Sequence, residues 1–121
     1  MKRDVSARAA TFLPLKPEVF EILLALESGA MHGYGILKSI EARGIGMAAS
    51  LLYRKLRRLM EDGLVGETVE RPDAAGDDAR RRYFRLTALG EAVMGAEARR
   101  ILTLSRSRRI RRVAERGGAH A

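Results

Sequence analysis

Residues 48–61 form the stretch AASLLYRKLRRLME. When successive side chains are placed 100° apart, it predicts a helix with one apolar face and one polar face. The apolar face is centred on Leu52 and comprises Leu52, Leu56, Leu59 and Met60. The opposite face carries three arginines and a hydroxyl and comprises Ser50, Arg54, Arg57, Arg58 and Glu61, with Tyr53 and Lys55 at its edges.

The rest of the chain predicts a mainly α-helical fold with a small β-hairpin. The predicted elements are helices at 17–28, 34–44 and 48–61, strands at 64–70 and 81–87 joined by a polar loop, and a last helix from Ala88, capped by Thr87, to about Val113. Residues 1–11 are expected to form a frayed polar arm and residues 117–121 a disordered end. This order predicts a winged helix-turn-helix domain at 12–87 and a C-terminal helix at 88–116. Helix 48–61 would be the recognition helix and the hairpin the wing.

The charge of the chain favours an anionic partner. The 121 residues carry a formal net charge of +8 and have a sequence pI of about 10.8, which favours nucleic acid first and a membrane surface second. Most of the excess lies in residues 99–116, which hold eight arginines against one acid, Glu115. Cysteine is absent, which excludes disulfides and thiolate chemistry. With neither a signal peptide nor a run long enough to span a bilayer, a cytoplasmic protein without a membrane partner is expected.

The outer face of the recognition helix is a candidate surface for double-stranded DNA. Arg54, Arg57 and Ser50 would face bases or groove walls, because arginine can bond guanine edges bidentately. Arg58 and Lys55 would hold phosphates. The sequence leaves two alternatives open for Tyr53: its side chain would either contact a phosphate or pack half-buried against the wing. A solvated surface helix with the same charged face is the alternative.

The wing is the second candidate surface for DNA. Arg80, Arg81 and Arg82 would contact phosphates, although side chains alternate along a strand and only some of them can face one ligand. The alternative is pairing within the hairpin, with Asp77, Asp78 or Glu70, which would contribute little at a surface.

Residues from about Leu15 to Gly90 resemble the PadR-type transcriptional regulators. The resemblance rests on the order of five motifs: Ile22-Leu23-Leu24-Ala25-Leu26, His32-Gly33-Tyr34 with Ile40, Leu52-Tyr53-Arg54-Lys55-Leu56-Arg57-Arg58-Leu59, Asp62-Gly63-Leu64-Val65, and Arg81-Arg82-Tyr83-Phe84-Arg85-Leu86-Thr87 with Gly90. It implies a homodimeric winged-helix repressor, often responsive to a small aromatic or hydrophobic molecule, and the single C-terminal helix is similar to the shorter branch of the family.

The chain departs from that family just before the Leu-Tyr pair. The family has Ser, Gly and Ser or Thr there, whereas this chain has Ala48, Ser50 and Leu51. The cap of the recognition helix is therefore expected to differ, with Ser50 as a partial substitute one turn later.

The last helix predicts a dimerisation surface. Its apolar stripe consists of Leu89, Val93, Ala96, Ile101 and Leu104. A long helix projecting from a small domain cannot bury such a stripe on its own chain, so a second copy is the expected partner. The alternative is that the helix folds back on the first helix of the same chain. An effector pocket, if present, is expected near Phe20 and Met94. The arginine-rich end would extend the DNA contact, or form a solvated face that suits an anionic membrane.

Catalytic and metal sites are not expected. His32 beside Gly33 is expected to bond a nearby backbone group, and His120 is the only other histidine, so no metal or cofactor is expected. No nucleophile motif, phosphate loop or carboxylate pair indicates an enzyme. The hypothesis is a sequence-specific repressor that binds a pseudo-palindromic operator as a homodimer. The alternative is a dimeric winged-helix interaction module whose basic tail binds an acidic protein or RNA.

Overall fold

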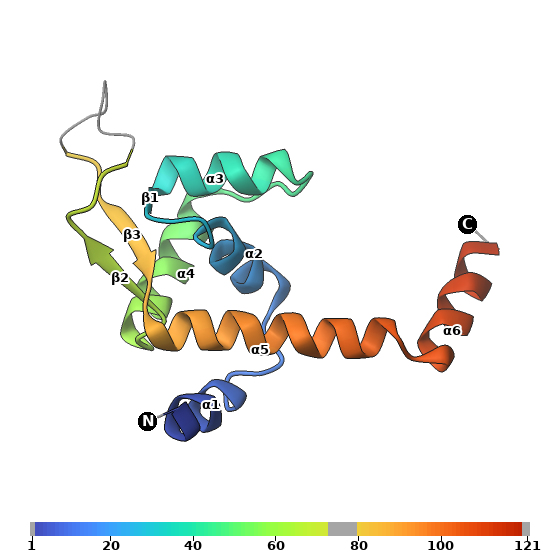
Figure 1. Ribbon diagram of the computed structural model, residues 1–121. Helices are drawn as coiled ribbons and strands as arrows, with labels where there is room; N and C mark the ends of the chain where they lie inside the picture. The colour runs from blue at the N-terminus through green and yellow to red at the C-terminus, as the bar shows by residue number, and fades with distance from the viewer. Residues whose placement is uncertain (1, 73–79, 120–121) are drawn as a thin grey trace.

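The structure is a computed structural model that describes residues 2–72 and 80–119. Its elements are α1 (Lys2–Ala10), α2 (Pro17–Ala25), β1 (Met31–His32), α3 (Gly33–Ala42), α4 (Ala49–Glu61), β2 (Val65–Thr68), β3 (Tyr83–Leu86), α5 (Ala88–Ser105) and α6 (Arg108–Ala119). The predicted mainly α-helical fold with a small β-hairpin is confirmed. In Figure 1, α5 runs beneath the body formed by α2, α3 and α4, and the β2–β3 hairpin lies at the opposite end of the molecule from α6.

The core lies between α2, α3, α4 and the start of α5. Of the predicted apolar face of α4, Leu52, Leu56 and Leu59 are at most 4% exposed and Met60 is half-buried. They meet Ile22 of α2 and Ile36 of α3, among other aliphatic side chains of the same cluster. Each fully buried aliphatic side chain stabilises the fold by about 1.5–3 kcal/mol relative to an exposed one. This packing fixes the opposite face of α4 toward solvent.

A third strand joins the wing to the start of α3. The sheet order is β1-β3-β2, with antiparallel pairing of His32 with Tyr83 and of Val65 with Leu86. The sequence did not predict β1, because two residues are too short to show an alternating pattern. Its consequence is that His32, the residue before α3, is hydrogen-bonded into the wing.

The junction of the wing and α5 is closely packed. The predicted Thr87 cap is confirmed, because Thr87 Oγ1 accepts a hydrogen bond from the Gly90 N–H at 3.0 Å. The same hydroxyl donates to the carbonyl oxygen of Gly63 at 2.6 Å. A β-carbon at residue 90 would lie only 2.9 Å from the carbonyl carbon of Leu64, so the close approach of α5 to the Leu64 backbone requires glycine at residue 90.

The N-terminal residues form a helix, which corrects the prediction of a frayed arm at 1–11. Helix α1 packs on α5, with Ala9 buried and Val5 against the core cluster. The segment after α1 is held by Glu97 of α5, whose carboxylate accepts a hydrogen bond from the Leu15 N–H at 3.2 Å. The prediction failed because the apolar face of α1 is narrow and is stabilised by α5, which is distant in sequence.

The C-terminal residues form two helices, which corrects the prediction of one helix from Ala88 to about Val113. Helix α5 ends at Ser105, and the Ser107 hydroxyl then accepts a hydrogen bond from the Ile110 N–H at 3.3 Å, as a helix N-cap does. Gly117 and Gly118, predicted to be disordered, lie in α6. Residues 120 and 121 lie outside the described part of the chain. Figure 1 shows α6 turned sharply away from the α5 axis.

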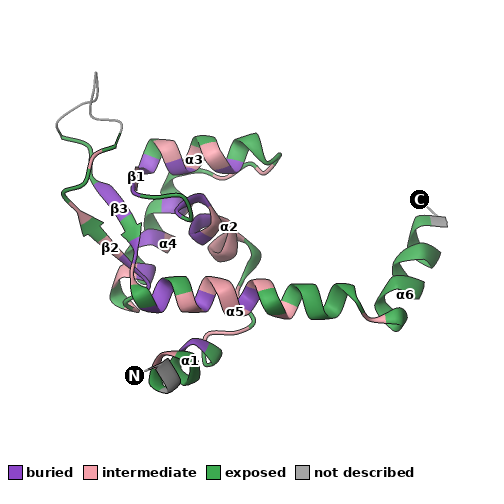
Figure 2. Cartoon of the chain, in the orientation of Figure 1, coloured by how far each residue is buried: buried purple, intermediate pink, exposed green. Residues whose placement is uncertain are grey.

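The predicted dimerisation stripe is divided between two environments. Leu89 and Val93 are buried in the core of their own chain, where α5 meets α1 and α2, so they are not available to a second copy. Ala96 is half-buried, whereas Ile101 and Leu104 are 40% and 42% exposed. Figure 2 shows the same division, with buried positions at the start of α5 and exposed ones at its end and on α6. None of the described helices is long and apolar enough to cross a membrane.

Candidate nucleic-acid interface

The outer face of α4 is exposed, as its sequence predicts. Ser50, Arg54, Arg57 and Arg58 all lie on the solvent side of the helix. Among the described residues, neither Arg54 nor Arg57 has a carboxylate partner. Their guanidinium groups are therefore available for an anionic ligand.

The start of α4 lacks a side-chain cap. Its N-cap residue is Ala48, and no side chain accepts a hydrogen bond from the first turn. The expectation that Ser50 partly substitutes as the cap is therefore wrong, because Ser50 lies inside the first turn of the helix. The free N–H groups of such a helix start favour an anion.

Two basic residues of α4 are paired at the surface. Arg58 Nε lies 3.3 Å from Asp62 Oδ2, and Lys55 Nζ lies 3.8 Å from Glu18 Oε1. The Arg58 side chain is 74% exposed, and exposed pairs contribute about 0–1 kcal/mol, whereas the Lys55 side chain is only 21% exposed. Arg58 can therefore exchange its carboxylate for a phosphate at little energetic cost.

Tyr53 packs across the first residue of α3. A β-carbon at Gly33 would lie 2.7 Å from Cζ of Tyr53, so the ring occupies the space that a side chain at residue 33 would need. Tyr53 nevertheless remains 46% exposed. The ring therefore packs against α3, whereas the packing considered from the sequence was half-buried against the wing; Tyr53 shares the hollow described below with the wing arginines.

The side chains of Arg81 and Arg82 contact different parts of the molecule. Arg82 forms an ion pair with Glu67 across the hairpin, and this hydrogen-bonded guanidinium lowers the pKa of Glu67. Glu67 is a partner that the sequence did not suggest. Arg81 instead reaches α3: its Nη1 lies 3.1 Å from His32 Nε2 and its Cζ lies 5.5 Å from the centre of the Tyr34 ring. The suggested partners Asp77 and Asp78 lie outside the described residues.

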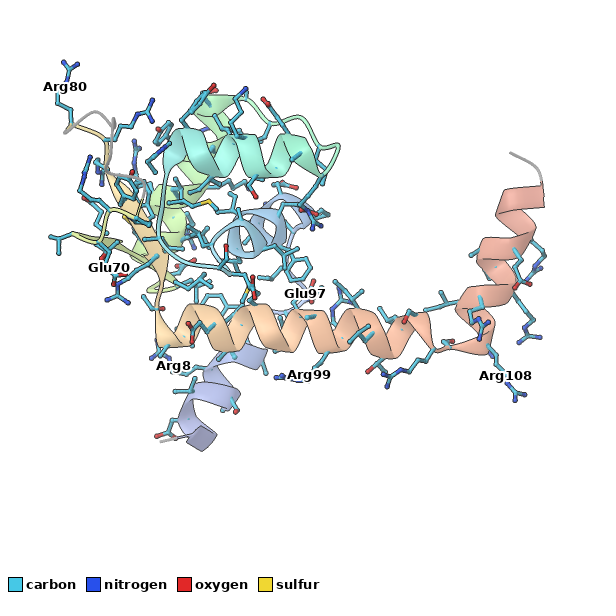
Figure 3. All side chains as sticks on the ribbon, turned by 45° about the horizontal axis from the view of Figure 1, so that its top comes forward. Arg8, Glu70, Arg80, Glu97, Arg99 and Arg108 are labelled. Carbon is cyan, nitrogen blue, oxygen red and sulfur yellow. The ribbon has the colours of Figure 1, made fainter. Side chains whose placement is uncertain are left out.

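A surface hollow of about 460 Å³ lies where α3, α4 and the wing meet. It is lined by His32, Gly33, Tyr34, Tyr53, Arg80, Arg81 and Arg82. Four of these residues were predicted to contact DNA. Figure 3 shows Arg80 projecting from the wing end, far from Arg108 on α6. The structure thus brings the wing arginines and one edge of α4 to the same hollow.

Besides Gly33, His32 and Tyr34 are the lining residues that the sequence did not assign to this surface. The prediction for His32 itself is confirmed, because its Nδ1 accepts a hydrogen bond from the Gly35 N–H at 3.0 Å and caps α3. The signal that could have placed both residues here is the pairing of β1 with β3, which the sequence hides. The described residues contain no group of side chains suited to a metal ion.

The sequence matches one family model over residues 22–96, that of the transcriptional regulator PadR-like family. This match covers more than half of the chain. The chain belongs to the PadR-like family. No curated protein matches its sequence.

Solved structures share the fold of this PadR-like chain. One is the RosR–S4 complex, with a TM-score of 0.64 and 22% identity over 96% of this chain and 94% of that chain. Another is Bacillus subtilis PadR in complex with operator DNA, with a TM-score of 0.57 and 18% identity over 69% of this chain and 46% of that chain. A third is a PadR family regulator from Clostridium difficile, with a TM-score of 0.60 and 23% identity over 71% of this chain and 90% of that chain.

The residues suggested for an effector lie away from the hollow. In this PadR-like chain Phe20 of α2 and Met94 of α5 are both half-buried, and Met94 packs against the core cluster. They are not among the residues that line the hollow at the wing.

Proposed function

We propose that the chain is a sequence-specific DNA-binding repressor that acts as a homodimer on a pseudo-palindromic operator. The observation that carries the proposal is the outer face of α4, where Arg54 and Arg57 are exposed and have no carboxylate partner among the described residues. Family membership supports the same conclusion, because the matched family consists of transcriptional regulators.

In this proposal α4 enters the major groove. Arg54, Arg57 and Ser50 contact base edges or groove walls, since arginine is the side chain best suited to bidentate contact with guanine. Arg58 and Lys55 exchange their surface carboxylates for phosphates, which fixes the register of the helix. Tyr53 and the wing arginines hold the adjacent backbone. The B. subtilis relative solved with operator DNA supports this use of the fold.

The proposed dimer uses the exposed end of α5. Ile101, Leu102 and Leu104 are 40%, 53% and 42% exposed on the chain alone, which is unusual for three large aliphatic side chains within four residues. A second copy that covers them would place two recognition helices about a two-fold axis, and paired half-sites on DNA mirror such symmetry. Response to a small hydrophobic or aromatic effector near Phe20 and Met94 remains part of the proposal.

The test is discrimination between DNA sequences at fixed salt. A duplex selected from a random pool and a scrambled duplex of equal length and composition are titrated with the purified protein by fluorescence anisotropy. A specific regulator prefers its site by about a thousandfold or more, whereas binding driven by charge alone gives equal affinities. Equal affinities would instead support the interaction module with a basic tail, which family membership does not favour.

A further inference from the structure

One nitrogen of the His32 ring accepts a hydrogen bond, and the other nitrogen faces the guanidinium of Arg81. Its Nδ1 accepts the hydrogen bond from the Gly35 N–H at 3.0 Å, so a neutral ring carries its proton on Nε2. That Nε2–H lies 3.1 Å from Nη1 of Arg81, and a guanidinium can only donate. The two groups therefore present protons to each other and form no hydrogen bond in this tautomer. An acceptor placed between them could accept a hydrogen bond from each.

The ring cannot readily turn away from this position. His32 is 8% exposed, and the ring of Tyr83 lies against it edge-on at 5.2 Å between centroids and 88° between planes. The backbone of His32 is also paired with Tyr83 in the sheet. The Nε2–H is thus a fixed donor at the wall of the hollow.

The surroundings of this donor favour an anion. Tyr34 lies between two cations, with Lys38 Nζ at 5.2 Å and Arg81 Cζ at 5.5 Å from its ring centre, and these contacts help to keep Arg81 over the hollow. Tyr53 forms another wall with its phenol group. Among the described residues, no carboxylate lines the hollow. Hydrogen bonds from charged donors to an oxyanion are the strongest of their kind in proteins.

We propose that this hollow holds one phosphate of the DNA backbone, which accepts hydrogen bonds from His32 Nε2–H and from the guanidinium of Arg81. The inference rests on the proposed function and deepens it, because it assigns to the start of α3 a contact that neither α4 nor the wing supplies alone. Since His32 lies in β1 of the sheet and caps α3, the phosphate would tie the start of α3 to the wing.

The test couples one side chain to one phosphate. His32→Asn keeps a side-chain oxygen that can cap α3 through the Gly35 N–H but lacks the Nε2 donor, and Arg81→Ala removes the second donor. Both variants and the wild type are titrated with copies of the selected duplex, in each of which one backbone phosphate is replaced by an uncharged methylphosphonate. Arg43→Ala is the matched control, because Arg43 pairs with Glu21 away from the hollow.

For the wild type, replacing one phosphate in each half-site should weaken binding by about tenfold, as loss of a charge-assisted contact does. Replacing that same phosphate should reduce the DNA affinity of His32→Asn and of Arg81→Ala markedly less than that of the wild type. The affinity of Arg43→Ala should fall as much as that of the wild type. A loss of affinity in His32→Asn that is equal for every duplex would overturn the proposal, as would unchanged affinity.

Two further readouts keep the outcomes distinct. If His32→Asn has a lower melting temperature than the wild type, the coupling measured with Arg81→Ala alone decides the result. Nitrogen-15 NMR of the wild type should show the Nε2–H of His32 shifting when the unmodified duplex is added and remaining unshifted with the critical methylphosphonate duplex. The proposed function fails separately, if the wild type binds selected and scrambled duplexes equally.

Discussion

The ring of Tyr53 lies across Gly33, so that the recognition helix α4 touches the start of α3 where any other residue would have a β-carbon. Gly33→Ala would place that β-carbon 2.7 Å from Tyr53 Cζ, and the half-exposed ring must move. We expect DNA affinity to fall several-fold while the melting temperature changes little, because the displaced group is the far end of an exposed side chain. Gly33→Ala combined with Tyr53→Ala should bind no more weakly than Tyr53→Ala alone.

Gly90→Ala is the matched control for this prediction. Its β-carbon would meet the backbone of Leu64 rather than a movable side chain. Overpacking against fixed atoms should destabilise the fold by about 1–3 kcal/mol in denaturant unfolding. Equal losses of stability in the two variants would contradict the account of Gly33.

The exposed end of α5 should carry the dimer. Ile101→Asp and Leu104→Asp each place a charge on the proposed interface and should yield monomers in sedimentation experiments at tens of micromolar protein. Val69→Asp changes a side chain that is 95% exposed in the wing and should remain dimeric. A monomeric wild type, or dimers in all three variants, would exclude this surface.

The elements that the sequence predicted are those whose apolar residues recur at a regular spacing within one segment of the chain. The α4 face from Leu52 to Leu59 is the best example, because its 3.6-residue period needs no partner to be recognised. The two-residue strand β1 and helix α1 were missed, since pairing and packing with residues far along the chain stabilise both. The stripe of α5 was recognised, but its division into a buried and an exposed half depends on where α1 lies.

The same limit applies to the candidate site. Arg54 and Arg57 were predicted to be exposed from helix geometry alone, and they are. The contact of Arg81 with His32 spans 49 residues and follows from the β1–β3 pairing, which has no local signal in the sequence.

Removal of residues 106–121 tests the arginine-rich end. The cut lies after the last residue of α5 and removes six arginines and one glutamate. If α6 is an auxiliary phosphate clamp, the truncated protein should remain dimeric and keep its operator preference. Its affinity should fall on every DNA, with a shallower dependence on salt, because phosphate contacts carry no sequence information. Loss of the dimer would instead assign Ile110 and Val113 to the interface, and an unchanged salt slope would exclude the clamp.

Glu97 should make stability depend on pH. This buried carboxylate accepts hydrogen bonds from Arg100 Nε at 2.6 Å and from the Leu15 N–H, and the Arg100 guanidinium above all lowers its pKa below the usual 4.5. A lowered folded-state pKa stabilises the fold above the unfolded-state pKa, and this contribution is lost as the pH falls through the folded value. Glu97→Gln should therefore unfold at lower urea concentration than the wild type near neutral pH.

The difference between Glu97→Gln and the wild type should shrink as the pH falls below about 4.5, because Glu97 of the wild type then becomes protonated. Glu91→Gln is the control, since Glu91 is exposed on the same helix and should show no such difference. If the difference in stability to urea between Glu97→Gln and the wild type stays constant with pH, the ionised carboxylate is not what stabilises the fold.

If α4 contacts bases while the wing contacts phosphates, selection from a random duplex pool should show the two roles separately. The wild type should enrich an inverted repeat with half-sites separated by about one helical turn or a multiple of it. Arg54→Ala should enrich the same repeat with one or two positions per half-site relaxed, and lose about 1–3 kcal/mol on the wild-type site. Arg81→Ala should enrich the unaltered repeat with weaker binding to every duplex. No enriched repeat for the wild type, or an identical repeat for Arg54→Ala with equal losses of affinity in both variants, would contradict the account.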